Sequence, residues 1–134
     1  MKILIFDPVG GASGDMILGS LIHLGCPPEE VQSALASLGL GPFDLRLEEK
    51  LVHGIATLNL GFETPEQHHH RTYREIRRII TDAALDPVVR MQALEIFRLL
   101  AEAEAAVHRV AVDEVHFHEI GALDSLYDIV GISA

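Results

Sequence analysis

The chain has 134 residues, 49% of them hydrophobic, and a net charge of −10 from ten Lys and Arg against twenty Asp and Glu. This length suits one domain with a real core, and the apolar content excludes a disordered chain. The acidic balance argues against broad binding to nucleic acids or anionic membranes, which needs a basic face, and it suits attraction of cations.

A single cysteine, Cys26, excludes an internal disulfide framework and a cysteine-based metal cage. The apolar run at the start is too short for a signal peptide, and no stretch is long enough to span a bilayer. We therefore expect a cytoplasmic protein. A homo-oligomer stays open.

The first part of the chain predicts a strand, a glycine-rich turn and a helix. Residues 2–6 form a short apolar run typical of a buried strand, and Asp7 ends it. The turn that follows leads into a helix over residues 15–24, with Ser13 as its cap and Asp15 at the positive end of its dipole. Backbone N–H groups around Gly14 are a candidate phosphate cradle, although the known nucleotide fingerprints do not match. A tight turn that needs small residues explains the pattern equally well.

The next part predicts a second helix, which begins at Pro28 and ends by Gly39, followed by a hairpin. Apolar and polar residues alternate over residues 43–48 and 55–62, which is typical of half-buried strands. Residues 52–54 between them are expected to form a hairpin or a bulge.

The second half predicts three more helices. Thr72 and Glu75 match the capping box, so a helix is expected to start there. Asp86 and Pro87 predict the start of a long helix that continues to about residue 108. A last helix is expected over residues 122–132, with Asp124 and Asp128 one turn apart. The chain stops soon after, which is typical of a piece of a larger protein.

Two histidine-rich stretches carry the chemistry that stands out. His68, His69 and His70 lie just before the predicted helix start at Thr72. His116 and His118 are two residues apart, so on an extended segment they share one face while Val115 and Phe117 face the core. Imidazoles suit nickel, zinc, copper and iron, and the carboxylate of Glu119 can complete such a site. The two stretches together predict a divalent-metal site, although solvated surface histidines explain the pattern about as well.

These patterns predict one α/β-type domain, with α+β as the alternative, in which a small mixed sheet is packed by about five helices. The strand–turn–helix unit favours parallel pairing and the later hairpin is antiparallel.

Three blocks of the sequence resemble the LarC-type nickel-insertion proteins. The blocks are residues 7–16 (DPVGGASGDM), residues 68–72 (HHHRT) and residues 115–131 (VHFHEIGALDSLYDIVG), in the family's order and spacing. The resemblance covers essentially all 134 residues, and family chains are about three times as long. It therefore implies that residues 1–134 are the N-terminal domain, and that the C-terminal CTP-binding domain is absent.

The resemblance also implies an activity. Family members insert nickel into a pyridinium bis-thiocarboxylic acid mononucleotide, using CTP and Mg or Mn, to make the nickel-pincer cofactor of lactate racemase. This is a lyase-type chelatase reaction that we expect of the full-length chain and not of this piece alone. The motif residues carried over as metal ligands are His68, His69, His70, His116, His118 and Glu119. Those carried over as supporting or ligand-contacting residues are Asp7, Ser13, Gly14, Asp15, Asp124 and Asp128.

Two alternatives stay open beside a nickel-relaying enzyme domain. One is a metal-binding or assembly module with no chemistry of its own. The other is a nucleotide or phosphate binder that uses the turn from Gly10 to Gly14. The mononucleotide and the chain's own C-terminal domain are the expected partners.

Overall fold

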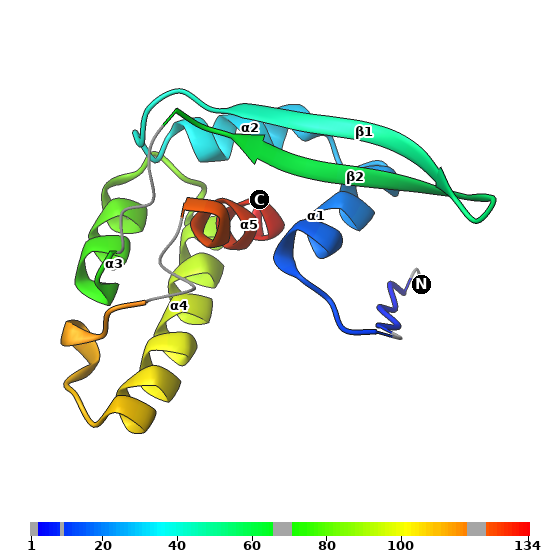
Figure 1. Ribbon diagram of the computed structural model, residues 1–134. Helices are drawn as coiled ribbons and strands as arrows, with labels where there is room; N and C mark the ends of the chain where they lie inside the picture. Colours follow the sequence, from blue (N-terminus) through cyan, green and yellow to red (C-terminus); the bar gives the residue numbers. More distant parts are fainter. Residues whose placement is uncertain (1–2, 9, 66–70, 118–122) are drawn as a thin grey trace.

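The structure is a computed structural model that describes residues 3–8, 10–65, 71–117 and 123–134 (Figure 1). In these residues, five α-helices and one β-hairpin make a single small domain of mixed α and β structure, which confirms the predicted fold class. In chain order the elements are α1 (Gly14–His23), α2 (Pro28–Ala36), β1 (Asp44–Val52), β2 (Ile55–Glu63), α3 (Tyr73–Asp82), α4 (Pro87–His108), the short 3-10 helix η1 (Val112–Glu114) and α5 (Leu123–Ser133).

The hairpin follows from the alternating pattern and from its turn. β1 and β2 pair antiparallel from Asp44 opposite Glu63 to Val52 opposite Ile55, so two residues form the turn. Those residues, His53 and Gly54, both have positive φ, at 50° and 81°, as the tightest hairpin turns require. Within the described residues the sheet has these two strands only, and one of its faces packs on α1.

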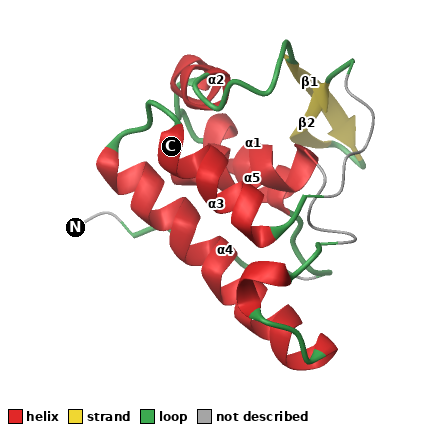
Figure 2. Ribbon diagram, turned by 90° about the vertical axis from the view of Figure 1, so that its left-hand side faces the viewer, coloured by secondary structure: helices red, strands yellow, loops and turns green. Residues whose placement is uncertain are grey.

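Helix α5 is the centre of the core. It lies beneath the hairpin in Figure 1 and contacts α1, α2 and α4. Figure 2 shows the helices gathered together, with the hairpin at their edge. Tyr127 is 1% exposed, and its ring centroid lies 5.2 Å from those of Phe43 and Phe62. A Cβ on Gly131 would lie 2.8 Å from a methyl group of Leu18, so this glycine lets α1 and α5 approach closely.

The N-terminal segment differs from the prediction. Residues 3–8 have no strand structure, and the apolar side chains of the predicted strand are exposed, Ile3 by 71% and Ile5 by 79%. The prediction of a buried strand over residues 2–6 is therefore wrong for the residues described. A strand needs a partner edge to satisfy its backbone, and none of the described residues supplies one to this segment.

Two helix starts form as their local signals require. The Asp86 carboxylate accepts the Val88 N–H at 2.8 Å, with Pro87 at the first helical position, and α4 runs from there to His108. The capping box of Thr72 and Glu75 starts α3, which also confirms the prediction.

Candidate functional site

The segment that carries His116 lies against the start of α3. An isolated antiparallel bridge pairs Thr72 with His116, and the Tyr73 N–H donates to the Val115 carbonyl at 3.0 Å. The residues that follow the first histidine stretch are therefore neighbours of the residues that begin the second. The bridge joins positions that are far apart in the sequence and fixes the local register between them.

Burial alternates along this segment as an extended backbone requires. Val115 and Phe117 are each 1% exposed, whereas His116 between them is exposed to solvent. The Phe117 ring meets the buried Tyr73 ring edge-on, with centroids 6.5 Å apart, and the Phe97 ring at 6.1 Å. This confirms that Val115 and Phe117 face the core, and it leaves the His116 imidazole accessible to a metal ion.

Glu75 stabilises the Thr72 side of this bridge. Its Oε2 accepts the Thr72 N–H at 2.7 Å and the Thr72 hydroxyl at 2.8 Å, and its own N–H donates to the Thr72 Oγ1 at 3.3 Å. These bonds lower the pKa of the Glu75 carboxyl below its usual range, and the charges of Arg71 and His116 add to the effect. An ionised carboxylate therefore lies beside the His116 segment at neutral pH.

The other predicted ligands lie outside the described residues. His68, His69 and His70 fall within residues 66–70, and His118 and Glu119 fall within residues 118–122. Across residues 3–8, 10–65, 71–117 and 123–134, no group of three or more His, Cys, Asp or Glu side chains is placed to hold a metal ion. Of the predicted ligands, the structure places His116 only.

A second contact between distant motifs lies at the start of α1. A Cβ built on Gly14 would lie 2.5 Å from both the Cβ and the Oδ2 of Asp128, so only glycine lets α5 approach here. The Asp128 carboxylate consequently sits against the N-terminal end of α1, and it takes a hydrogen bond from the Asp15 backbone. The structure thus brings together three of the predicted supporting residues, Gly14, Asp15 and Asp128.

Asp128 has an unfavourable environment for its charge. Desolvation by burial, together with the negative charges of Asp15 and Asp124, raises the pKa of its carboxyl to about 6, and a hydrogen bond from the Asp15 backbone offsets only part of this rise. Its Oδ1 is buried without a hydrogen-bond partner among the described residues. This carboxyl therefore titrates close to neutral pH.

The remaining supporting residues are more exposed. Ser13 occupies the N-cap position of α1, but its side chain makes no capping bond and donates instead to the Asp15 carboxylate, which also accepts the Met16 N–H at 2.8 Å. Ser13 therefore caps the helix by position only. Asp124 is exposed in the first turn of α5, and Asp7 lines a cavity of about 270 Å³ against α1.

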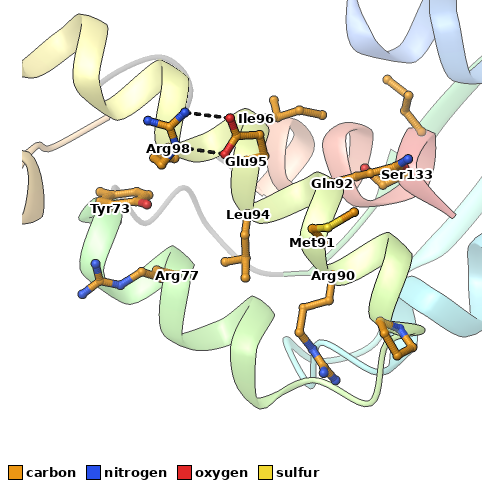
Figure 3. Close-up of a pocket in the computed structure, with 12 residues that line it drawn as sticks. Tyr73, Arg77, Arg90, Met91, Gln92, Leu94, Glu95, Ile96, Arg98 and Ser133 are labelled. Atoms are coloured by element: carbon orange, nitrogen blue, oxygen red, sulfur yellow. Dashed lines mark hydrogen bonds and ion pairs between the residues drawn. The ribbon is translucent and has the colours of Figure 1, made fainter.

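The largest cavity described, about 850 Å³, opens around α4 between Tyr73 and Arg77 of α3 and the end of α5 (Figure 3). Its walls are mainly apolar. Each of its arginines has a partner: Arg77 pairs with Asp113 at 3.0 Å, Arg98 pairs with Glu95 at 2.6 Å, and Arg90 donates to the Ala83 carbonyl at 2.8 Å. An anion entering this cavity would have to displace these partners, so we assign no function to it.

Two contacts at the candidate site were not predicted. One is the Thr72–His116 bridge, and the other is the Gly14–Asp128 contact. The sequence did signal part of the first, because the capping box marks Thr72 and Glu75 as a fixed helix start immediately after the histidines. It gave no local signal for the second, since packing of α1 on α5 depends on the tertiary fold.

No helix in the described part of the chain is both long and apolar enough to cross a membrane. No solved structure matches this chain.

The chain is similar to several curated proteins that share the name pyridinium-3,5-bisthiocarboxylic acid mononucleotide nickel insertion protein. It is 43% identical to the protein of Akkermansia muciniphila over 140 residues, which cover 98% of this chain and 34% of that one. It is 41% identical to the Acetivibrio thermocellus protein over 140 residues, with 98% and 34% covered. It is 38% identical to the protein of Staphylococcus epidermidis strain RP62A over 130 residues, with 97% and 33% covered.

The chain thus spans about a third of the length of these relatives. The family model described as nickel insertion protein matches residues 4–134. This match covers nearly the whole chain and includes all three sequence blocks discussed above. The chain belongs to the nickel insertion protein family.

Proposed function

We propose that this chain is the N-terminal domain of a nickel insertion protein, and that its two histidine-bearing segments bind Ni(II) and deliver it to the rest of the polypeptide. The family match and the names of the relatives support nickel as the metal and the pyridinium bisthiocarboxylic acid mononucleotide as its acceptor. The relatives are about three times as long, so we expect insertion to need the part of the protein that this sequence does not include. Two expectations stay predictions: that the protein is cytoplasmic, and that the cofactor made with its nickel serves a lactate racemase.

The observation that supports this proposal most is the pairing of Thr72 with His116. In an antiparallel pair, directly opposite residues point to the same face, and so do residues two positions further along each strand. His70 lies two residues before Thr72 in the sequence, and His118 lies two residues after His116. The pairing of Thr72 with His116 therefore supports a site drawn from both histidine stretches.

The chemistry of these residues suits nickel. Nickel accepts imidazole nitrogen and carboxylate oxygen, so the proposed ligands are drawn from His68, His69, His70, His116, His118 and Glu119. An exposed imidazole such as His116 can bind a metal ion and release it, and the net charge of −10 concentrates cations around the domain. These side chains bind and hand over an ion, while the bonds of nickel to the acceptor form elsewhere.

Phosphate binding by the turn at residues 10–14 receives no support from the geometry. The start of α1 already faces the Asp128 carboxylate, whose Oδ2 lies 2.5 Å from the position of a Cβ on Gly14, and Asp15 adds a second negative charge. Both carboxylates would repel a phosphate group. The described residues therefore do not fit CTP at this position, and we derive no step through CTP or its Mg or Mn ion in this domain.

Isothermal titration with Ni(II) tests the proposal. The variant that changes His68, His70, His116 and His118 to alanine should bind at least tenfold more weakly than the unmodified chain. A matched control changes His23 and His108, which lie at the ends of α1 and α4, and it should keep the affinity. Equal affinity of the unmodified chain and the four-residue variant would refute the proposal.

Turnover assays separate an enzyme domain from a binding module. The mononucleotide and Ni(II) would be supplied with CTP to a full-length relative, such as the Akkermansia muciniphila protein, and to this chain alone. We expect nickel insertion by the relative and none by this chain. Insertion by this chain alone would contradict the proposed division of labour.

A further inference from the structure

Glu75 connects the start of α3 to the segment that carries His116. Its Oε2 accepts two hydrogen bonds from Thr72, one from the backbone at 2.7 Å and one from the hydroxyl at 2.8 Å. The Thr72 side chain returns a third bond by accepting the Glu75 N–H at 3.3 Å. Glu75 therefore fixes both the backbone and the side chain of Thr72.

Thr72 in turn lies directly opposite His116 in the antiparallel bridge. The next residue, Tyr73, donates its N–H to the Val115 carbonyl at 3.0 Å and packs its buried ring against Phe117. Each residue on either side of His116 is thus attached to the α3 start, by a hydrogen bond at Val115 and by ring packing at Phe117. A displacement of Thr72 would be passed on to His116 through these contacts.

The position of Glu75 differs from that of an ordinary helix cap. Asp86 caps α4 from the N-cap position, where it accepts the Val88 N–H at 2.8 Å, but in the described part of the chain no β-bridge includes it. The residue capped by Glu75 is itself the bridge partner of a candidate metal ligand. Groups that hold a metal ligand in place commonly change metal affinity by 10- to 100-fold when they are removed.

We infer that Glu75 is a positioning residue for nickel binding, which holds His116 in place through Thr72 without coordinating the ion itself. The inference rests on the proposed function in one respect, namely that His116 is a nickel ligand. It goes further in naming a residue outside the histidine motifs and in stating how that residue acts.

The experiment compares three variants of the 134-residue chain by amide hydrogen exchange and by Ni(II) calorimetry. Glu75→Ala removes the acceptor. Glu75→Gln keeps an oxygen that can accept the same bonds, because glutamine also serves in the capping box. Asp86→Ala removes a side-chain cap from the start of α4 and serves as the control for lost helix stability.

For Glu75→Ala we expect exchange of the Tyr73 amide to be at least tenfold faster and Ni(II) affinity to fall by about tenfold. Glu75→Gln should restore both to within about threefold of the unmodified chain, and Asp86→Ala should leave both unchanged. Unchanged exchange at Tyr73 in Glu75→Ala would overturn the inference, as would a loss of affinity no larger than that of Asp86→Ala.

The two measurements also separate this inference from the proposed function. If the unmodified chain bound no Ni(II), the proposed function would fail and the inference that Glu75 serves nickel binding would fail with it. If the chain bound Ni(II) while Glu75→Ala kept its affinity, only the inference would fail.

Discussion

The Thr72–His116 bridge and the Gly14–Asp128 contact each join distant motifs, and each contains a carboxyl group, but the two carboxyl groups respond oppositely to their surroundings. Hydrogen bonds from Thr72 lower the pKa of Glu75, whereas burial beside Asp15 and Asp124 raises the pKa of Asp128 to about 6. The first group is stabilised as an anion at the surface, next to an exposed imidazole. The second is half-buried between α1 and α5, where its charge is costly.

This difference shows that carboxyl groups at two contacts of the same kind can have different structural roles. The bridge offers an ionised, accessible surface to a cation. The contact at Gly14 allows two helices to approach closely and leaves a buried carboxyl oxygen without a partner among the described residues. Removing the groups that distinguish the two regions tests the comparison.

Phe117→Ala is expected to have the largest effect. The side chain is 1% exposed and packs on the rings of Tyr73 and Phe97, so its truncation should lower the free energy of unfolding by about 3–5 kcal/mol. His116→Ala, one residue earlier but exposed, should change it by less than about 0.5 kcal/mol. Urea denaturation measures both. Similar losses in the two variants would show that the segment does not alternate between core and solvent.

Gly14→Ala should have the next largest effect. The added Cβ would meet the Asp128 Cβ at 2.5 Å, and this atom cannot move without α5, so we expect a loss of about 2 kcal/mol in the free energy of unfolding. Gly10→Ala is the control, because a Cβ there has no atom within 4 Å. Thermal or urea unfolding of the two variants should differ clearly, and equal stability would argue against the close approach of α1 and α5.

Thr72→Ala tests the cap on the bridge side. It removes an acceptor for the Glu75 N–H and a donor to its carboxylate, and it should cost about 1 kcal/mol of unfolding free energy. Ser13→Ala at the start of α1 should cost less than half of this, because the Ser13 side chain makes no capping bond. The comparison is made by urea denaturation at neutral pH. A larger loss for Ser13→Ala would contradict the assignment of the two caps.

Asp128→Asn tests the half-buried Asp128 carboxyl through the pH dependence of stability. The folded-state pKa of about 6 lies above the ordinary value of 3.8, so this group favours folding most below pH 4, and that contribution is lost as the pH rises through 6. A fully buried group with this shift would contribute about 3 kcal/mol, and solvent screening of a half-exposed one reduces this to about 1 kcal/mol. The unfolding free energy of the variant minus that of the unmodified chain should therefore be about 1 kcal/mol higher at pH 8 than at pH 4. Denaturation at both pH values measures the difference, and an equal effect at both would count against the raised pKa.

Local signals predicted much of the fold. The capping box at Thr72, the Asp86–Pro87 helix start and the alternation of the hairpin each depend on neighbouring residues, and each formed as expected. The strand over residues 2–6 failed because an apolar run becomes a strand only when another strand accepts its backbone. The residues of the apolar run do not themselves indicate which strand would pair with it.

The candidate site was likewise predicted only where it depends on neighbouring residues. The alternation of Val115, His116 and Phe117 follows from an extended backbone and could be anticipated. The pairing of that segment with Thr72 and the approach of Asp128 to Gly14 depend on how α1, α3 and α5 pack, which the sequence pattern does not encode locally. The roles of the histidines in residues 66–70 and 118–122 as metal ligands stay predictions.

The bridge also bears on when the domain could acquire a metal. Its two halves are separated by roughly forty residues of chain that form α3, α4 and η1, so closing this loop comes late and carries an entropic cost. If the two histidine stretches bind one ion together, as proposed, an unfolded chain must meet this entropic cost on binding and holds the ion more weakly than the folded domain. Tight binding of Ni(II) would then require the folded domain, and only folded molecules would deliver the metal.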